Sequence, residues 1–329
     1  MISRKRLFFT VLIVLFAAVF VFLFVGKAKE AENITWGVNF SQKQAMELNL
    51  DWRETYLALL QDLNVKNLKI AAHWDMLEPE DQQFFFEDLD WQMDEAALHG
   101  AKVLLAVGMK TPRWPECHIP SFAKEFSNED LRSQILEMLS AVVLRYKDHP
   151  ALFAWQVENE PLLLFGECPW RDFSFLEKEI NLVQSLDLEH EVYTSDSGEL
   201  SLWFNVARLG DKVVVSLYQN MWSAEFNTYL SLPYPAVFYW RKAWLIEKLF
   251  GKEVVVGELQ AEPWVRGELV NSTFYEQEKT MTLTRLQYNI AFAKETGLNT
   301  FYLWGAEWWY QMKEVRGRQE FWQEAQHLF

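Results

Sequence analysis

The chain has 329 residues, of which 50 % are hydrophobic and 23 % charged, so it can build a large core and lacks the composition of a disordered protein. The formal net charge of −15 argues against nucleic acid as a partner, because phosphate binding needs clustered cations. Aromatic residues reach 16 % and include 16 tryptophans, a residue that proteins use to stack on flat ligands such as sugar rings.

The N-terminal residues 1–29 differ in composition from the rest of the chain. Three cations at 4–6 precede an uninterrupted apolar run over 7–25. A membrane-spanning helix needs about 17 to 25 residues, whereas the apolar region of a cleaved signal peptide has about 7 to 15. We therefore expect an N-terminal transmembrane helix that anchors the protein, with a cleaved signal peptide as the alternative. The leading cations predict a cytoplasmic N-terminus and an extracytoplasmic domain over 30–329, which would be secreted if the segment is cleaved.

No Pro-, Gly- or Ser-rich linker divides residues 30–329, which predicts one domain. Short apolar, β-branched runs alternate in it with longer amphipathic stretches, a pattern typical of repeated β-α units. We predict eight strands, at Ile34–Phe40, Asn67–Ala72, Lys102–Val107, Phe153–Glu158, Glu191–Thr194, Lys212–Leu217, Glu253–Glu258 and Thr300–Trp304.

Helices are predicted between these strands. One covers Ser127–Tyr146, where Ser127 and Asp130 have the spacing of a capping box, and another covers Phe274–Glu295 and ends before Gly297. Eight strands alternating with helices favour an α/β fold, a single closed (β/α)8 TIM barrel, over an open doubly wound sheet. The chain contains no GxGxxG and no P-loop motif, so we expect no nucleotide cofactor.

The two cysteines, Cys117 and Cys168, both lie in loop-like sequence. An oxidising compartment would permit a disulfide between them, and two free thiols are the alternative. The six histidines have no metal-ligand spacing, and we expect no metal site.

In TIM barrels the chemistry occurs at the carboxyl ends of the strands. Two of the predicted strand ends carry carboxylates, within 154–161 and within 254–264. Cleavage of a glycosidic bond needs one carboxylic acid that protonates the departing oxygen and a second carboxylate that attacks the anomeric carbon or activates water. These two strand ends therefore suggest a pair of catalytic glutamates.

The segment 145–150 (Arg-Tyr-Lys-Asp-His-Pro), with Trp155 and Asn159-Glu160-Pro161 after it, resembles the fourth strand of the clan A glycoside hydrolases. These barrel enzymes include cellulase-like, mannanase-like and beta-galactosidase families, and the resemblance extends over about 34–329. It implies that Glu160 is the acid/base and that Glu258, at the end of the seventh strand, is the nucleophile.

The resemblance also implies substrate-binding roles. Asn159 would hold the sugar 2-hydroxyl, Trp304 would form the floor of the subsite next to the cleaved bond, and Tyr218 would orient the nucleophile. Clan members commonly carry an arginine near the nucleophile, where this chain offers Lys69, which supplies the charge but not a bidentate fork.

Further residues near the strand ends are candidates for sugar contacts. Asp196 and Glu199 suit hydroxyl binding or a solvated loop, whereas the aromatic candidates suit stacking or core packing. The additional candidates are His73, Trp74, Trp264, Trp308, Asp196 and Glu199. Glu158 and Glu262 also lie near the two strand ends, but we expect Glu262 to line the rim of the cleft or form a salt bridge, and the resemblance favours Glu160 over Glu158.

The sequence thus predicts a retaining glycosidase that acts on a beta-linked oligo- or polysaccharide, without a cofactor and as a monomer. Retention requires carboxyl groups about 5 to 5.5 Å apart, and a raised pKa on Glu160. Two alternatives stay open at this point: a transglycosidase on the same barrel, and a non-catalytic surface protein that binds carbohydrate.

Overall fold

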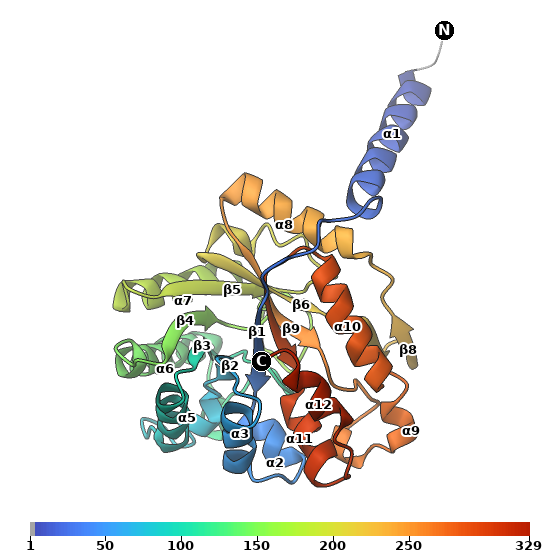
Figure 1. Cartoon of the computed structure of the whole chain (residues 1–329). Helices are drawn as coiled ribbons and strands as arrows, with labels where there is room; N and C mark the ends of the chain where they lie inside the picture. The colour runs from blue at the N-terminus through green and yellow to red at the C-terminus, as the bar shows by residue number, and fades with distance from the viewer. Residues whose placement is uncertain (1–3) are drawn as a thin grey trace.

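The computed structural model describes residues 4–329 and contains a closed barrel of eight parallel strands, in the order β1-β10-β9-β6-β5-β4-β3-β2 (Figure 1). The TIM-barrel prediction is confirmed, and three strands begin and end where the sequence predicted. The barrel strands are β1 (Thr35–Phe40), β2 (Asn67–Ala71), β3 (Lys102–Val107), β4 (Leu152–Val157), β5 (Glu191–Asp196), β6 (Lys212–Leu217), β9 (Val254–Gln260) and β10 (Thr300–Trp304).

Helices surround the barrel, and a two-stranded hairpin follows β6 (Figure 1). The helices are α1 (Arg4–Phe24), α2 (Gln42–Glu47), α3 (Trp52–Gln61), α4 (Trp74–Leu77), α5 (Glu87–Leu98), α6 (Asn128–Tyr146), α7 (Phe173–Leu186), α8 (Ala236–Phe250), α9 (Phe274–Gln277), α10 (Leu283–Glu295), α11 (Ala306–Glu314) and α12 (Glu320–Gln326). The hairpin strands are β7 (Asn220–Ser223) and β8 (Thr228–Ser231), and short 3-10 turns lie at Ser121–Ala123, Val206–Arg208 and Leu269–Asn271.

The predicted cap of α6 is present, since the Ser127 hydroxyl accepts a hydrogen bond from the Asp130 backbone N–H at 3.2 Å. The single helix predicted over 274–295 is wrong, because the chain forms the separate helices α9 and α10 there. Thr282 caps α10, and between the two helices the Thr280 hydroxyl accepts from the Trp264 backbone N–H at 3.0 Å. This hydrogen bond connects the segment between α9 and α10 to the loop after β9.

Two apolar layers hold the barrel together. A small cluster forms one part of the interior, with Leu104, Ala154, Tyr193, Val214, Val255 and Tyr302. A much larger cluster fills the space between the strands and the surrounding helices. Side chains that alternate along each strand therefore serve both layers, as the pleat of a strand requires.

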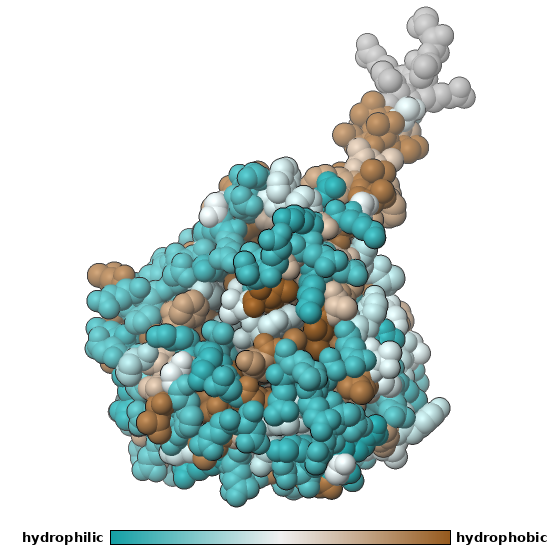
Figure 2. Space-filling view, viewed as in Figure 1, coloured by the Kyte–Doolittle hydropathy of each residue, from teal (hydrophilic) through white to brown (hydrophobic). Residues whose placement is uncertain are grey.

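The N-terminal helix α1 extends away from the barrel, and the space-filling view shows an apolar surface along it (Figures 1 and 2). Its C-terminal end contacts α8, where the rings of Phe24 and Phe238 stack with centroids 5.2 Å apart. Among the residues that the structure describes, no helix combines the length and apolarity that crossing a membrane would take. The predicted transmembrane helix is therefore not supported.

Candidate active site

Glu258 lies in β9 at the mouth of the barrel, and both of its carboxylate oxygens accept hydrogen bonds. Lys69 of β2 donates to Oε1 at 3.1 Å, and the Tyr218 hydroxyl donates to Oε2 at 3.0 Å. Lys69 is 2 % exposed and Glu258 is 7 % exposed, so this ion pair is shielded from water. The structure thus brings together three residues that the sequence selected, and the cation and the phenol hold one carboxylate in a single orientation.

Glu160 follows β4 at the same mouth, in a left-handed backbone conformation with φ 45°. The Ser216 hydroxyl donates to its Oε1 at 2.7 Å, and its backbone N–H donates to the Ser195 hydroxyl at 2.8 Å. Burial and the charge of Glu258 raise the pKa of Glu160 to about 8. A carboxyl group that keeps its proton at neutral pH can protonate a leaving group.

Glu158 has a structural role. Its two carboxylate oxygens accept hydrogen bonds from the backbone N–H groups of Met109 and Lys110, each at 2.7 Å. Gly108 makes this approach possible, because a Cβ at its φ of +129° would lie 2.4 Å from the Glu158 carboxylate. Glu158 therefore fixes the start of the segment after β3, and the expectation that Glu160 rather than Glu158 faces the site agrees with this geometry.

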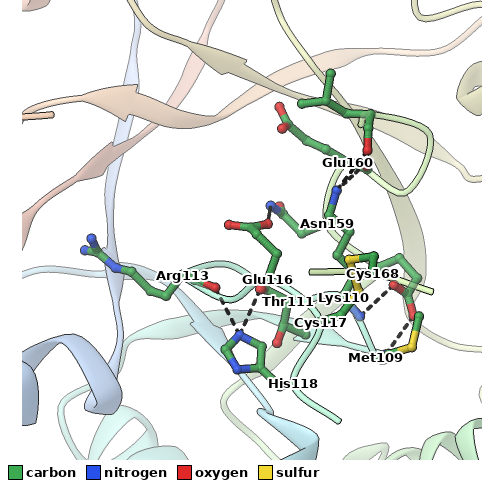
Figure 3. The surroundings of a disulfide bond; sticks show 12 residues. Met109, Lys110, Thr111, Arg113, Glu116, Cys117, His118, Asn159, Glu160 and Cys168 are labelled. Carbon is green, nitrogen blue, oxygen red and sulfur yellow. Dashed lines mark hydrogen bonds between the residues drawn. A yellow bond between two sulfur atoms is a disulfide. The ribbon is translucent and has the colours of Figure 1, made fainter. Parts of the chain in front are cut away.

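The segment 108–120, hereafter the β3 loop, brings Glu116 and Arg113 to the site, two residues that were not predicted from the sequence. Cys117 in this loop forms a disulfide with Cys168 (Figure 3). Glu116 is 7 % exposed and accepts a hydrogen bond from Asn159 Nδ2 at 3.4 Å (Figure 3). Burial, with the charges of Glu258 and Glu160, raises the pKa of Glu116 to about 8 although the Lys110 charge lowers it, so a third carboxyl group belongs to this site. Its sequence context gave no signal beyond the neighbouring cysteine.

Arg113 is the second such residue. Its guanidinium forms ion pairs with Glu262 and, at 3.1 Å, with Glu307, and it lies 3.9 Å from the centre of the Trp304 ring. A cavity of about 10 Å³ adjoins Trp304, Arg113 and Lys69, which is room for about one water molecule. Trp304 thus lies at the mouth as expected, but Arg113 covers its ring. Glu262 forms the salt bridge that the sequence suggested.

Two of the predicted stacking residues are core residues instead. Trp74 and Trp308 are both 0 % exposed, and their indole N–H groups donate to Glu78 and Gln277. The prediction that they stack on sugar is wrong, because core side chains cover both rings. The strand-end pattern could not separate a ring that faces the mouth from one that faces the helices.

His73 is also buried, at 3 % exposed, with Nδ1 3.0 Å from the Thr111 hydroxyl and its ring against His118. Burial lowers the pKa of His73, followed by the His118 and Lys43 charges. His73 therefore supports the base of the β3 loop. The prediction that it binds substrate has no support in this arrangement.

Asp196 and Glu199 use their oxygens within the protein. Asp196 accepts from the Ser201 hydroxyl and from the Ser197 N–H. Glu199 accepts from the Tyr218 N–H at 3.0 Å and from the Tyr239 hydroxyl at 2.8 Å. Hydroxyl binding by this pair stays a prediction, and Glu199 also holds the backbone of Tyr218, whose hydroxyl donates to Glu258.

Trp264 lies beside the site. Its ring contacts Tyr218 edge to face at 5.1 Å and Phe165 at 5.9 Å, and Phe165 continues to Trp114 at 6.1 Å. Trp114 is 58 % exposed, so this row of rings leads from Glu258 to the surface. Such a row suits stacking against further sugar units.

Within residues 4–329 as described, no cluster of three or more His, Cys, Asp or Glu is arranged for a metal ion.

Parts of this chain are similar in sequence to known glycoside hydrolases. A beta-galactosidase family model matches residues 48–175. Beta-galactosidase Pbg from Clostridium perfringens is 33 % identical over 151 residues, which cover 40 % of this chain and 21 % of that protein. Mannan endo-1,4-beta-mannosidase F from Aspergillus clavatus is 29 % identical over 118 residues, covering 33 % of this chain and 26 % of that protein. Over these stretches the chain is thus similar to a beta-galactosidase and to a mannan endo-1,4-beta-mannosidase.

Two solved enzyme structures have the same fold. Xylanase 10B from Thermotoga maritima superposes with a TM-score of 0.59 at 14 % identity, over 90 % of this chain and 95 % of that one. The endo-beta-1,4-mannanase from Thermotoga petrophila gives 0.57 at 17 % identity, over 84 % and 68 %. The matched parts span only about a quarter of the length of the two curated relatives.

Proposed function

We propose that the protein is a retaining beta-glycoside hydrolase in which Glu258 is the nucleophile and Glu160 the acid/base. The observation that carries the proposal is the unequal environment of the two carboxyl groups. Glu258 accepts hydrogen bonds from a buried lysine and a phenol, which orient it for attack, whereas burial raises the pKa of Glu160 to about 8, so that Glu160 can donate a proton. Double displacement needs this division of roles.

In the first step Glu258 would attack the anomeric carbon while Glu160 protonates the departing glycosidic oxygen. The sugar would then be bound covalently to Glu258, and Glu160, now ionised, would take a proton from a water molecule that releases the sugar. Lys69 and Tyr218 would hold the attacking oxygen in place, and Asn159 would bind the 2-hydroxyl. The relatives named beta-galactosidase and mannan endo-1,4-beta-mannosidase support a beta-linked hexopyranoside as the substrate class.

Trapping of the covalent intermediate tests this proposal. The protein is incubated with 2-deoxy-2-fluoro beta-galactosides, beta-mannosides and beta-glucosides that carry activated leaving groups, and tryptic peptides are mapped by mass. We expect one sugar adduct, on Glu258, and none in Glu258→Ala. An adduct on another residue would contradict the assignment. Folded protein without any adduct would favour a non-catalytic carbohydrate-binding protein, and transfer to an added acceptor sugar would favour a transglycosidase.

We also propose that the barrel works outside the cytoplasm. The Cys117–Cys168 disulfide supports this compartment, because reducing cytosols keep thiols free. Alkylation of protein from intact cells, followed by mass analysis, tests it: both cysteines should resist alkylation until a reductant is added. Two alkylated cysteines without reductant would contradict the proposal.

A further inference from the structure

Glu116 differs from the other buried carboxylates at the mouth of the barrel. Glu258 is paired with Lys69, and Glu262 and Glu307 share Arg113. Glu116 has instead one long hydrogen bond, from Asn159 Nδ2 at 3.4 Å. A protonated carboxyl group has one O–H donor and further acceptor sites, so most of the hydrogen-bonding capacity of Glu116 is free for a ligand.

The fold holds Glu116 in this place from both sides. The backbone N–H of Glu116 donates to the Arg113 carbonyl at 2.7 Å, and its carbonyl accepts from the Thr111 N–H at 2.9 Å. The next residue, Cys117, forms a disulfide with Cys168. Figure 3 shows the carboxylate of Glu116 directed at Asn159, the residue that precedes Glu160 in the chain. A tight turn with a covalent staple thus presents one acidic side chain to the site.

We propose that Glu116 is a substrate-binding residue that, together with Asn159, holds the 2-hydroxyl of the sugar whose bond is cleaved, and that the Cys117–Cys168 disulfide keeps it in position. This assignment rests on the proposed function. The hydroxyl would donate to a Glu116 oxygen and accept from Asn159 Nδ2, replacing the long hydrogen bond between the two side chains. Because burial and the neighbouring carboxylates raise the pKa of Glu116 to about 8, glutamine resembles its protonated form at pH 6.

The test compares variants on two substrates, an aryl beta-glycoside and its 2-deoxy analogue. Glu116→Ala should lower kcat/KM about 10- to 100-fold on the full sugar and at most about threefold on the 2-deoxy sugar, since the lost hydrogen bond exists only with the first. Glu116→Gln, which keeps a hydrogen-bonding group at this position, should lose less kcat/KM on the full sugar at pH 6 than Glu116→Ala loses. Glu167→Gln is the matched control, because Glu167 is exposed and adjoins the same disulfide.

The disulfide is tested in the same assay. Reduction of the folded parent, or the double change Cys117→Ser and Cys168→Ser, should lower kcat/KM on the full sugar, and Glu116→Ala should then add little. Equal losses on both sugars, or a Glu116→Ala variant as active as Glu167→Gln, would overturn the assignment while adduct formation on Glu258 leaves the proposed function standing. A parent that forms no adduct overturns the proposed function and this assignment with it.

Discussion

The guanidinium of Arg113 lies 3.9 Å from the centre of the Trp304 ring and forms ion pairs with both Glu262 and Glu307. One side chain therefore joins the β3 loop to the ends of β9 and β10. Glu307 is 0 % exposed, and burial raises its pKa to about 7 although the Arg113 charge lowers it. The arginine is the counter-charge for two buried carboxyl groups.

Replacing Arg113 by alanine is expected to lower the free energy of unfolding by about 3 to 5 kcal/mol, because both carboxylates lose their cation inside the protein. Urea unfolding followed by tryptophan fluorescence measures this change. A control is Arg53→Ala, whose ion pair with Asp88 at 3.0 Å is about half exposed and should contribute less than about 1 kcal/mol. Adding Glu262→Gln and Glu307→Gln to Arg113→Met should restore most of the lost free energy of unfolding. Equal effects of Arg113→Ala and Arg53→Ala on that free energy would contradict the role of Arg113 as a buried counter-charge.

Lys69→Met is expected to slow adduct formation on Glu258 about 10- to 100-fold, because a buried hydrogen bond from a cation to the nucleophile disappears. Lys69→Arg should not restore the rate, since the wider guanidinium must fit beside Gly257 and Val214. Tyr218→Phe removes the neutral donor and should cost less. Stopped reactions analysed by intact mass give the three rates, and a fully active Lys69→Arg would mean that this position tolerates the arginine common in the clan.

The activity of the parent is expected to fall as the pH rises above about 8, because Glu160 acts in its protonated form and its pKa is raised to about 8. Ser216→Ala should move this limb to higher pH, since the Ser216 hydrogen bond lowers the pKa of Glu160. The profile of kcat/KM against pH measures both effects. In Glu160→Ala the limb should vanish for a dinitrophenyl glycoside, whose leaving group needs no acid; a limb that persists there belongs to another group.

Glu179 of α7 makes stability depend on pH. Burial, and next the charge of Glu158, raise its pKa well above the ordinary value of 4.5, so the folded protein holds a proton that the unfolded chain releases. Stability from this group is complete below pH 4.5 and is lost as the pH rises. Glu179→Gln should therefore melt at a higher temperature than the parent at pH 8, and the two should differ less at pH 5. Glu177→Gln, an exposed position on the same helix, should melt like the parent at both values.

The fold was predictable from local patterns. Every barrel strand contains β-branched residues. Each strand forms where the alternation of short apolar runs with longer amphipathic stretches predicts it. The break between α9 and α10 was not predictable, because it depends on the contact of Thr280 with Trp264, sixteen residues away in sequence.

The site was only partly predictable. Glu160, Glu258 and Tyr218 come from strand ends and Lys69 from the middle of β2, and their position in a barrel follows from the order of the strands. Glu116 and Arg113 come from the β3 loop, whose course is determined by the Glu158 carboxylate and the disulfide. Trp74 and Trp308 show the opposite error, since the residue type fits stacking but the side chain faces the core.

The Cys117–Cys168 bond closes a covalent ring whose ends are 51 residues apart in sequence, and that ring contains α6, β4 and Glu160. A single cut by a protease within 118–167 therefore yields two pieces that remain one molecule under non-reducing conditions. When the cut lies after Glu160, within 161–167, the piece that carries the proposed acid/base cannot diffuse away from the piece that carries Glu258. Nicked protein in a protease-rich surrounding could thus keep both carboxyl groups on one particle until a reductant separates them.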